Sequence, residues 1–235
     1  MAEIYLIRHG QASFGTANYD RLSPLGHRQA EVLGDCFRDC GIQFDATYSG
    51  ELERQTKTAQ IVLERQRDKV GCEVDVRFNE LETDAILKQL VPQLTQANPE
   101  LATLVKKGER SSKDFQKALE IVFLHWVTTD ENHPGLQSWA EYSSNAQRAL
   151  AEVISREGSG KTVAVFTSGG TIATLVAHVL GVSDALVYKF YEPVVNCSIT
   201  RLLYSGSKVS LSCFNDQQFI SLLGAQSGES LLTYR

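Results

Sequence analysis

Short apolar runs alternate with amphipathic stretches along most of the chain. The first run, at residues 4–7, is continuously apolar and ends abruptly in polar residues, which is typical of a buried strand near the centre of a sheet. Further strands are predicted at residues 44–49, 74–78, 162–166, 198–204 and 209–214, with 74–78 at a sheet edge and the last two runs forming a hairpin.

Amphipathic stretches between these runs predict helices. Ser23 can cap a helix that begins at Pro24, and apolar residues then recur on one face until Gly41 stops the pattern. Comparable stretches predict further helices at residues 52–63, 142–154 and 171–180.

Strands that alternate with helices favour an α/β fold. We expect a three-layer sandwich, in which helices flank both faces of a mostly parallel central sheet. From about residue 83 to residue 138 the pattern changes to helical segments of weak periodicity. We interpret this segment as a small helical cap inserted into a single domain that spans residues 1–235. The polar tail at residues 224–235 can fray or dock, and the pattern leaves this open.

Composition and charge limit the partners of the chain. Its 235 residues hold 23 Lys and Arg against 28 Asp and Glu, which gives a formal net charge of −5. A general attraction to nucleic acid or acidic lipid is thereby excluded, so an anion site must depend on locally placed basic groups. No apolar run reaches the ~18 residues of a membrane span, and the first ten residues are too polar for a signal segment. We therefore expect a cytoplasmic protein with no nucleic-acid or membrane partner.

The cysteine count argues against a disulfide framework. Five cysteines are an odd number, and they are scattered through apolar stretches of a chain too large to need cross-links. Cys36 and Cys40 lie one helical turn apart and could share a metal, but no histidine or second cysteine pair lies nearby. We favour reduced, largely buried thiols and predict no metal site.

Two predicted strands end in residues that can carry chemistry. Arg8-His9-Gly10 follows the first strand, and Thr167-Ser168-Gly169-Gly170 follows a later one. Ligands of open α/β sheets bind at the carboxyl ends of the strands. The first of these strand ends therefore offers a cation and a potential nucleophile side by side.

These motifs belong to an ordered set. The chain resembles the histidine phosphatase superfamily, of which phosphoglycerate mutase is a familiar branch, and the likeness extends from residue 1 to about residue 220. It is carried by Ile7-Arg8-His9-Gly10-Gln11, Leu22-Ser23-Pro24-Leu25-Gly26, Gln29-Ala30, Ser49, Arg54, Thr58-Ala59, Glu80, Thr167-Ser168-Gly169-Gly170, Asn196 and Phe214-Asn215-Asp216. The resemblance implies one phosphoglycerate-mutase-like α/β domain, and the cap contributes little to it.

The resemblance implies a catalytic role for several of these residues. His9 would attack phosphorus and become a phosphohistidine, which splits one difficult displacement into two easier ones. Arg8 and Arg54 would hold phosphoryl oxygens with charge-assisted hydrogen bonds, so that neither a metal nor another cofactor is required. The substrate would be a phosphorylated small molecule or a phosphoprotein.

The family's general acid matches Glu80. It would protonate the leaving alkoxide and later deprotonate the attacking water. Glu82 and Asp84 follow so closely that they stay open as alternatives.

Polar residues near the two strand ends are candidate substrate contacts. Gln11, Ser13 and Asn18 lie in the loop after the nucleophile, where they can reach the phosphate or remain solvated. Gly169 opens the helix after the later strand, and a helix N-terminus attracts anions.

Ser168 is the main departure from the family pattern. The family carries a second histidine at this position, and serine offers a neutral donor on a shorter arm. Loss of one charge-assisted hydrogen bond is worth about 1.5–3 kcal/mol, and deletion of such a donor costs about 10²–10³ in rate. Backbone N–H groups of the following helix can compensate in part, as can another histidine of the chain. The remaining histidines are His27, His125, His133 and His178.

Three functions follow from these observations. The intact nucleophile favours a metal-independent phosphomonoesterase. Ser168 supports a catalytically weakened relative that binds a phosphorylated ligand. A phosphoglycerate mutase is the third alternative, but Gln137-Ser138 and Gln218-Phe219 stand where relatives commonly have Glu-Ser and histidine. A basic cluster in the cap could meet an anionic substrate or form a solvated face; it consists of Lys106, Lys107, Arg110 and Lys113.

Overall fold

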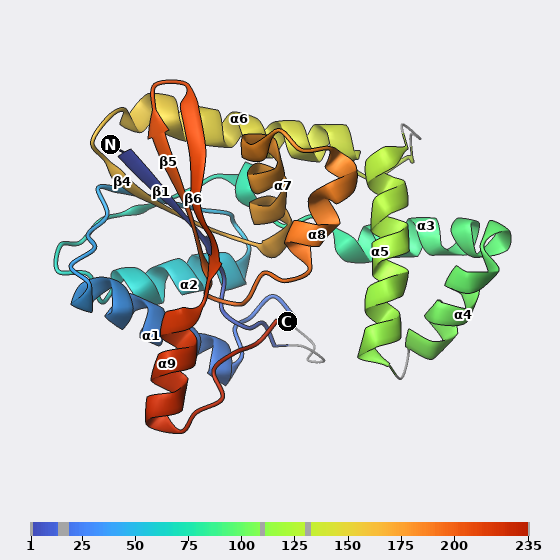
Figure 1. Ribbon diagram of the computed structural model, residues 1–235, viewed down its shortest axis with the longest axis horizontal. Helices are drawn as coiled ribbons and strands as arrows, with labels where there is room; N and C mark the ends of the chain where they lie inside the picture. The colour runs from blue at the N-terminus through green and yellow to red at the C-terminus, as the bar shows by residue number, and fades with distance from the viewer. Residues whose placement is uncertain (1, 14–18, 109–110, 130–132, 235) are drawn as a thin grey trace.

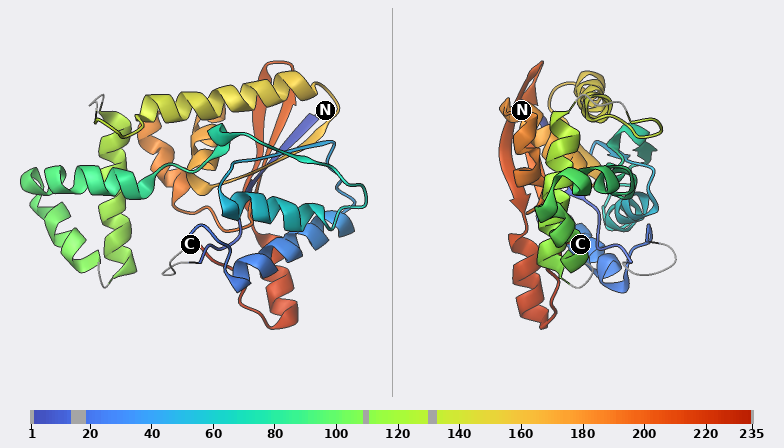
Figure 2. Two further views of the ribbon diagram at one scale, coloured as in Figure 1. Left: turned by 180° about the vertical axis from the view of Figure 1, so that it is seen from behind. Right: turned by 90° about the vertical axis from the view of Figure 1, so that its right-hand side faces the viewer.

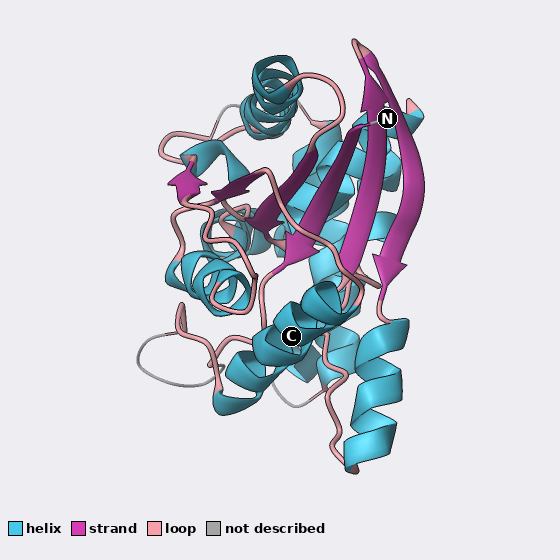
Figure 3. Ribbon diagram, turned by 90° about the vertical axis from the view of Figure 1, so that its left-hand side faces the viewer, coloured by secondary structure: helices cyan, strands magenta, loops and turns pink. Residues whose placement is uncertain are grey.

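Six strands form one mixed sheet in the described part of the protein, which comprises residues 2–13, 19–108, 111–129 and 133–234 of the computed structural model (Figure 3). The strands are β1 (Ala2–Arg8), β2 (Ala46–Ser49), β3 (Cys72–Val74), β4 (Thr162–Thr167), β5 (Ile199–Ser205) and β6 (Lys208–Asp216). Their order is β3-β2-β4-β1-β5-β6. The first four strands pair in parallel, whereas β5 and β6 add an antiparallel hairpin beside β1.

Helices cover both faces of this sheet, as the alternation of elements predicts (Figures 1 and 2). One apolar core joins one face of the sheet to α6 (Trp139–Glu157) and α7 (Gly169–Leu180). A second core joins the other face to α1 (Pro24–Asp39), α2 (Glu53–Leu63) and α9 (Gln218–Ser227). The α/β fold with three layers is therefore confirmed.

Strand β1 belongs to both cores, because successive side chains of a strand point to opposite faces. Ile4 and Leu6 pack in the core of α6 and α7, and Tyr5 and Ile7 pack in the core of α1 and α2. Such two-sided burial explains why the run is continuously apolar. Strand β1 pairs in parallel with β4. In this register Arg8 pairs with Thr167, so the carboxyl ends of the two strands lie side by side.

Three helices extend beyond the sheet. They are α3 (Thr83–Ala97), α4 (Pro99–Gly108) and α5 (Ser112–Thr128), and together they are called the helical extension below (Figure 1). A third core fills it, and this core includes Leu90, Leu101, Phe123 and Trp126. Residues of α6, α7 and α8 (Val187–Tyr191) belong to the same core and hold the extension against the body.

The structure corrects the strand predicted at residues 74–78. Strand β3 keeps only the first residue of that range, at the edge of the sheet, and Val76–Phe78 forms a 3-10 turn, η1. The Asp75 carboxylate caps this turn by accepting a hydrogen bond from the Arg77 N–H at 3.0 Å. Phe78 is fully buried. The turn gives up strand pairing at the sheet edge and gains the burial of this aromatic ring.

Two later segments were not predicted as helices. They are α8, preceded by a 3-10 turn η2 (Asp184–Leu186), and α9. The tail that follows α9 docks on the body. Leu231 is buried, and its carbonyl accepts a hydrogen bond from the Gln29 side chain at 2.7 Å. Tertiary contacts of this kind leave little trace in a local pattern.

The structure also bears on membrane spans, cysteines and metal sites. Across the described ranges, no helix is both long and apolar enough to cross a membrane. The five cysteines are free thiols, and Cys36 and Cys40 lie at the end of α1. The expectation of largely buried thiols is wrong, because of the five described thiols Cys197 alone is buried and Cys40 is exposed. Within those same ranges, no three histidine, cysteine or carboxylate side chains gather in a way that could hold a metal ion.

The loop after β1 lies directly against the first turn of α1. A Cβ atom on Gly26 would come within 2.1 Å of the Gln11 carbonyl oxygen, and one on Gly10 within 2.4 Å of the Gly26 carbonyl oxygen. The Gln29 side chain accepts the Gln11 N–H at 2.8 Å. This close packing fixes the backbone of Gly10 and Gln11, directly after His9.

We predict that Gly26→Ala destabilises the protein, although alanine is the better helix former. The new methyl group must displace a backbone carbonyl, and such overpacking costs about 1–3 kcal/mol. For a domain of this size, the melting temperature should fall by roughly 2–4 °C per kcal/mol. Gly71→Ala is the control, because a Cβ there would meet no atom within 4 Å. A melting temperature of Gly26→Ala at or above that of the wild type would contradict the packing.

Candidate active site

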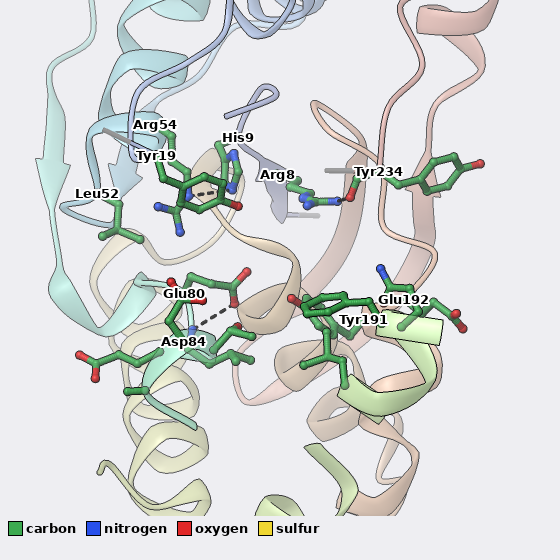
Figure 4. Close-up of a pocket in the computed structure, with 17 residues that line it drawn as sticks. Arg8, His9, Tyr19, Leu52, Arg54, Glu80, Asp84, Tyr191, Glu192 and Tyr234 are labelled. Carbon is green, nitrogen blue, oxygen red and sulfur yellow. Dashed lines mark hydrogen bonds between the residues drawn. The ribbon is translucent and has the colours of Figure 1, made fainter. Parts of the chain in front are cut away.

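A cavity of about 660 Å³ opens where β1 and β4 end (Figure 4). The His9 N–H donates to the Thr167 carbonyl at 2.9 Å, which continues the parallel ladder into the loop. The cavity also meets the start of α2, the start of α3, helices α5 and α8, and the C-terminal tail. Its lining consists of Arg8, His9, Tyr19, Leu52, Arg54, Glu80, Leu81, Glu82, Thr83, Asp84, Ala85, Phe115, Gln116, Leu119, Tyr191, Glu192 and Tyr234.

His9 is held as a neutral imidazole with a defined tautomer. Its Nδ1 lies 2.7 Å from the Gly10 carbonyl oxygen, which can only accept, so Nδ1 carries the proton. Its Nε2 accepts a hydrogen bond from Arg54 Nε at 3.1 Å. Burial, reinforced by the charges of Arg54 and Arg8, lowers the pKa of His9 well below its usual value. The lone pair of Nε2 is therefore available on a buried, uncharged ring.

Arg54 is positioned by a network at the start of α2. Its Nη1 donates to Asp20 at 2.6 Å, and the other oxygen of that carboxylate accepts the Glu53 N–H at 2.7 Å. The Tyr19 ring lies over the guanidinium, 5.6 Å from its central carbon. The sequence pattern does not indicate Asp20 or Tyr19 as site residues, because only the fold brings them to Arg54.

Arg8 lies on the opposite side of His9 and contacts backbone carbonyls. Its Nη1 donates to the carbonyl of Tyr234 at 3.0 Å and to that of Val194. Its Nε is buried and has no hydrogen-bond partner in the part of the chain that the structure describes. Burial lowers the pKa of Arg8, yet a guanidinium keeps its proton in proteins. Arg8 thus brings a positive charge and an unused donor to the edge of the cavity.

Glu80 reaches the first turn of α7 across the cavity. Its carboxylate accepts the Gly170 N–H at 3.1 Å and the Leu81 N–H at 3.0 Å. A Cβ on Gly170 would lie 2.3 Å from Glu80 Oε1, so this approach requires glycine. Burial raises the pKa of Glu80 above its usual value, against the opposing charges of Arg54 and Arg8. The alternatives considered from the sequence, Glu82 and Asp84, are exposed at the cavity mouth.

Ser168 and Gly169 do not line the cavity. Ser168 is fully buried, and its hydroxyl accepts a hydrogen bond from the Gln55 side chain at 2.8 Å. A Cβ on Gly169 would lie 3.2 Å from the Tyr191 ring, so this glycine accommodates a side chain. The N–H of the next residue is already used by Glu80. Gln55 is a further residue that the sequence pattern did not indicate.

The candidate substrate contacts in the loop after His9 lie away from the cavity or outside the described residues. The Gln11 side chain accepts a hydrogen bond from Ser23 at 2.8 Å, and the Ser13 N–H donates to Arg21 at 2.7 Å. Neither Gln11 nor Ser13 belongs to the described lining. Asn18 lies outside the described residues, so its predicted role stays a prediction.

Other basic groups considered from the sequence are also absent from the described lining. This holds for the four remaining histidines and for the lysines of the basic cluster, whose Arg110 lies outside the described residues. They are His27, His125, His133, His178, Lys106, Lys107 and Lys113.

Comparisons with known proteins assign this architecture to a family. The sequence model of the histidine phosphatase superfamily (branch 1) matches residues 4–120 and 108–217. The chain belongs to the histidine phosphatase superfamily. Both matched segments together span the sheet, the helical extension and every strand end that contributes to the cavity.

The chain is similar in sequence to phosphoglycerate mutases and in fold to solved phosphatases. The 2,3-bisphosphoglycerate-dependent phosphoglycerate mutase of Nautilia profundicola is 26% identical over 214 residues, which cover 81% of this chain and 89% of the relative. A mutant phosphoserine phosphatase from Entamoeba histolytica, in complex with phosphoserine, matches with a TM-score of 0.65 at 19% identity, over 94% and 100% of the two chains. A mycobacterial glucosyl-3-phosphoglycerate phosphatase matches with a TM-score of 0.63 at 20% identity, over 92% and 99%. The solved structures share the fold.

We predict that Glu80→Gln stabilises this histidine phosphatase at neutral pH. The carboxyl pKa is raised in the folded state, so the unfolded chain loses its proton first, and folded stability falls as pH rises from the ordinary carboxyl range through the raised pKa. An uncharged amide removes the free-energy cost of burying an ionised carboxylate, so the melting temperature at pH 7 should rise. The gain should vanish below about pH 4, where both states are protonated.

Glu82→Gln provides the matched control, because this neighbouring carboxylate is exposed. Its melting temperature should follow the wild type at both pH values. A lower melting temperature of Glu80→Gln at pH 7 would mean that the ionised carboxylate, with its two backbone donors, stabilises the fold.

Proposed function

We propose that this histidine phosphatase hydrolyses phosphomonoesters through a phosphohistidine at His9 and needs neither a metal nor another cofactor. The observation that carries the proposal is the neutral His9 imidazole, which is protonated on Nδ1 and offers Nε2 beside Arg54. A pure binding protein would gain nothing from a nucleophile held in this way. The substrate class is a phosphorylated small molecule or a phosphoprotein.

In the first step, the Nε2 lone pair of His9 attacks phosphorus, and the bond between phosphorus and the ester oxygen breaks. Glu80, whose raised pKa favours the protonated carboxyl, gives its proton to the leaving alkoxide. In the second step, the Glu80 carboxylate takes a proton from water, the oxygen attacks phosphorus, and the bond to Nε2 breaks. Inorganic phosphate leaves, and both residues return to their starting forms.

Arg54 and Arg8 supply the positive charge for both steps. Their charge-assisted hydrogen bonds suit a transition state whose negative charge spreads over the phosphoryl oxygens. Arg54 Nε already lies 3.1 Å from Nε2, so it can transfer its hydrogen bond to an oxygen as the new bond forms.

Charge elsewhere in the cavity favours hydrolysis over the mutase alternative. A phosphoglycerate mutase must hold a carboxylate as well as a phosphate. In the described lining, Arg8 and Arg54 are the basic groups apart from the nucleophile, whereas Glu82, Asp84 and Glu192 bring negative charge to the mouth. A second anionic group of the substrate would meet carboxylates, and like charges disfavour such binding.

We expect His9→Ala to abolish the hydrolysis of p-nitrophenyl phosphate in the presence of excess chelator. The variant has no atom that can accept the phosphoryl group. Quenching the wild type in alkaline detergent after reaction with a radioactive phosphoryl donor should also trap an alkali-stable, acid-labile phosphoenzyme, which His9→Ala should lack.

His27→Ala is the control for this experiment, because His27 does not line the cavity. It should retain turnover. Activity that survives His9→Ala would exclude His9 as the nucleophile, and activity that requires added metal would exclude the metal-independent mechanism. A wild type that binds phosphate without turnover would support the weakened, ligand-binding alternative.

We expect Glu80→Gln to discriminate between leaving groups. Alkyl phosphates need a proton on the departing oxygen, so their kcat should fall by about 10²–10⁴. p-Nitrophenyl phosphate has a stable leaving group and should lose far less. Because only the protonated acid works in the first step, the fall of alkyl phosphatase activity with rising pH should also disappear in the variant. Equal losses on both substrates would assign Glu80 a role other than general acid, and Asp84→Asn would then test the neighbouring carboxylate.

A further inference from the structure

The transferring phosphoryl group has three equatorial oxygens, and the described arginines reach it from two sides. Arg54 lies on one side of His9, and Arg8 lies on the other (Figure 4). Ser168 does not complete this set, because it is fully buried and its hydroxyl is engaged by Gln55. A donor that takes the place of Ser168 has to be sought in another part of the described lining.

Three tyrosines line the cavity, and they differ in how firmly they are held. Tyr19 and Tyr234 are 47% and 53% exposed, and Tyr19 covers the face of Arg54. Tyr191 is largely enclosed, and Figure 4 shows its hydroxyl pointing into the cavity on the side that faces Glu80. Only this last hydroxyl combines a fixed ring with a direction toward the reacting groups.

The ring of Tyr191 is fixed by contacts on several sides. It stacks on Phe123 with ring centres 5.9 Å apart and planes 19° from parallel. It meets Tyr188 edge to face at 5.8 Å. Gly169 allows its edge to approach α7, where a Cβ atom would lie only 3.2 Å from Cε2 of the ring. A ring packed in this way loses little further freedom when its hydroxyl binds a ligand.

The same glycines show that Tyr191 lies beside the catalytic groups. The Cβ position on Gly169 would be 3.2 Å from Tyr191 Cε2 and 3.7 Å from Arg8 Nε, and the one on the adjacent Gly170 would be 2.3 Å from Glu80 Oε1. Cε2 is next to the carbon that bears the hydroxyl. The hydroxyl end of Tyr191, the unused donor of Arg8 and the carboxylate of Glu80 therefore surround the first turn of α7.

The hydroxyl of Tyr191 is protonated at neutral pH. Burial, with the negative charge of Glu80 as a further cause, raises its pKa above the usual value for tyrosine, and a hydrogen bond with the Thr83 side chain acts in the opposite direction. The group is thus a neutral hydrogen-bond donor.

We propose that the Tyr191 hydroxyl donates a hydrogen bond to a non-bridging phosphoryl oxygen during transfer to and from His9. This inference rests on the proposed phosphatase function. Tyr191 undergoes no bond change, and its hydrogen bond strengthens as negative charge grows on the oxygen. It provides the donor that Ser168, turned into the protein, does not provide.

Tyr191→Phe tests the proposal. Loss of one preorganised donor should lower kcat for p-nitrophenyl phosphate by about 10²-fold, with a smaller change in KM. Affinity for vanadate, which imitates the transition state, should fall by a similar factor, and affinity for inorganic phosphate should fall less. A merely structural change would not separate these two anions. Melting temperatures report whether each variant folds.

Two variants serve as matched controls. Tyr188→Phe removes a hydroxyl from the same helix, but that hydroxyl binds the Gln116 carbonyl at 3.1 Å and Tyr188 does not line the cavity. Ser168→Ala removes the buried hydroxyl. Both should keep kcat within a few-fold of the wild type.

The outcomes separate this inference from the proposed function. If Tyr191→Phe keeps wild-type kcat and vanadate affinity, or if Ser168→Ala loses as much as Tyr191→Phe does, the inference is overturned while the phosphatase function stands. If His9→Ala is as active as the wild type, the proposed function itself fails.

Discussion

The parallel pairing of β1 with β4 is the constraint on which the site depends. Arg8 is level with Thr167 in this register, so two segments that are far apart in the sequence end at one edge of the sheet. The ladder continues for one more bond, from the His9 N–H to the Thr167 carbonyl. Because alternate side chains of both strands fill two different cores, a shift in register by one residue would place the side chains of each core in the other. Burial of the core thus also fixes the position of His9, the proposed nucleophile.

Burial also prepares the two groups that exchange protons and bonds at this edge. A low-dielectric environment disfavours charge, so it lowers the pKa of His9 and raises that of Glu80. Both shifts move the residues toward neutral forms, which is the direction that the proposed phosphoryl transfer requires. Arg8 and Arg54 keep their charges in the same place, because guanidinium groups do not release their protons. Burial therefore accounts for both shifts toward neutral forms, and the intrinsic basicity of guanidinium accounts for the two charges that remain.

The sequence was sufficient to predict the layers and the residues at the strand ends. The apolar run of β1 and the motif after it indicate a nucleophile at a sheet edge, and His9 lies there in a cavity that Arg54 and Glu80 also line. The sequence could not show where each side chain turns. Ser168 follows a strand end in the sequence as His9 does, yet its hydroxyl faces Gln55 and not the cavity. Orientation depends on neighbours brought together by the fold, and no local pattern contains them.

Residues missed by the sequence share a physical reason. Asp20 and Tyr191 lie on a loop and on a short helix, where neither periodicity nor capping singles out one polar residue from another. Their importance arises from the glycines and arginines they face. Gly169 and Gly170 illustrate this, because the missing side chains let an aromatic ring and a carboxylate approach the first turn of α7. A helix N-terminus that would otherwise attract a free anion is thereby used to hold the acid in place. Under the proposed function, the substrate would then be bound by side-chain donors around the cavity.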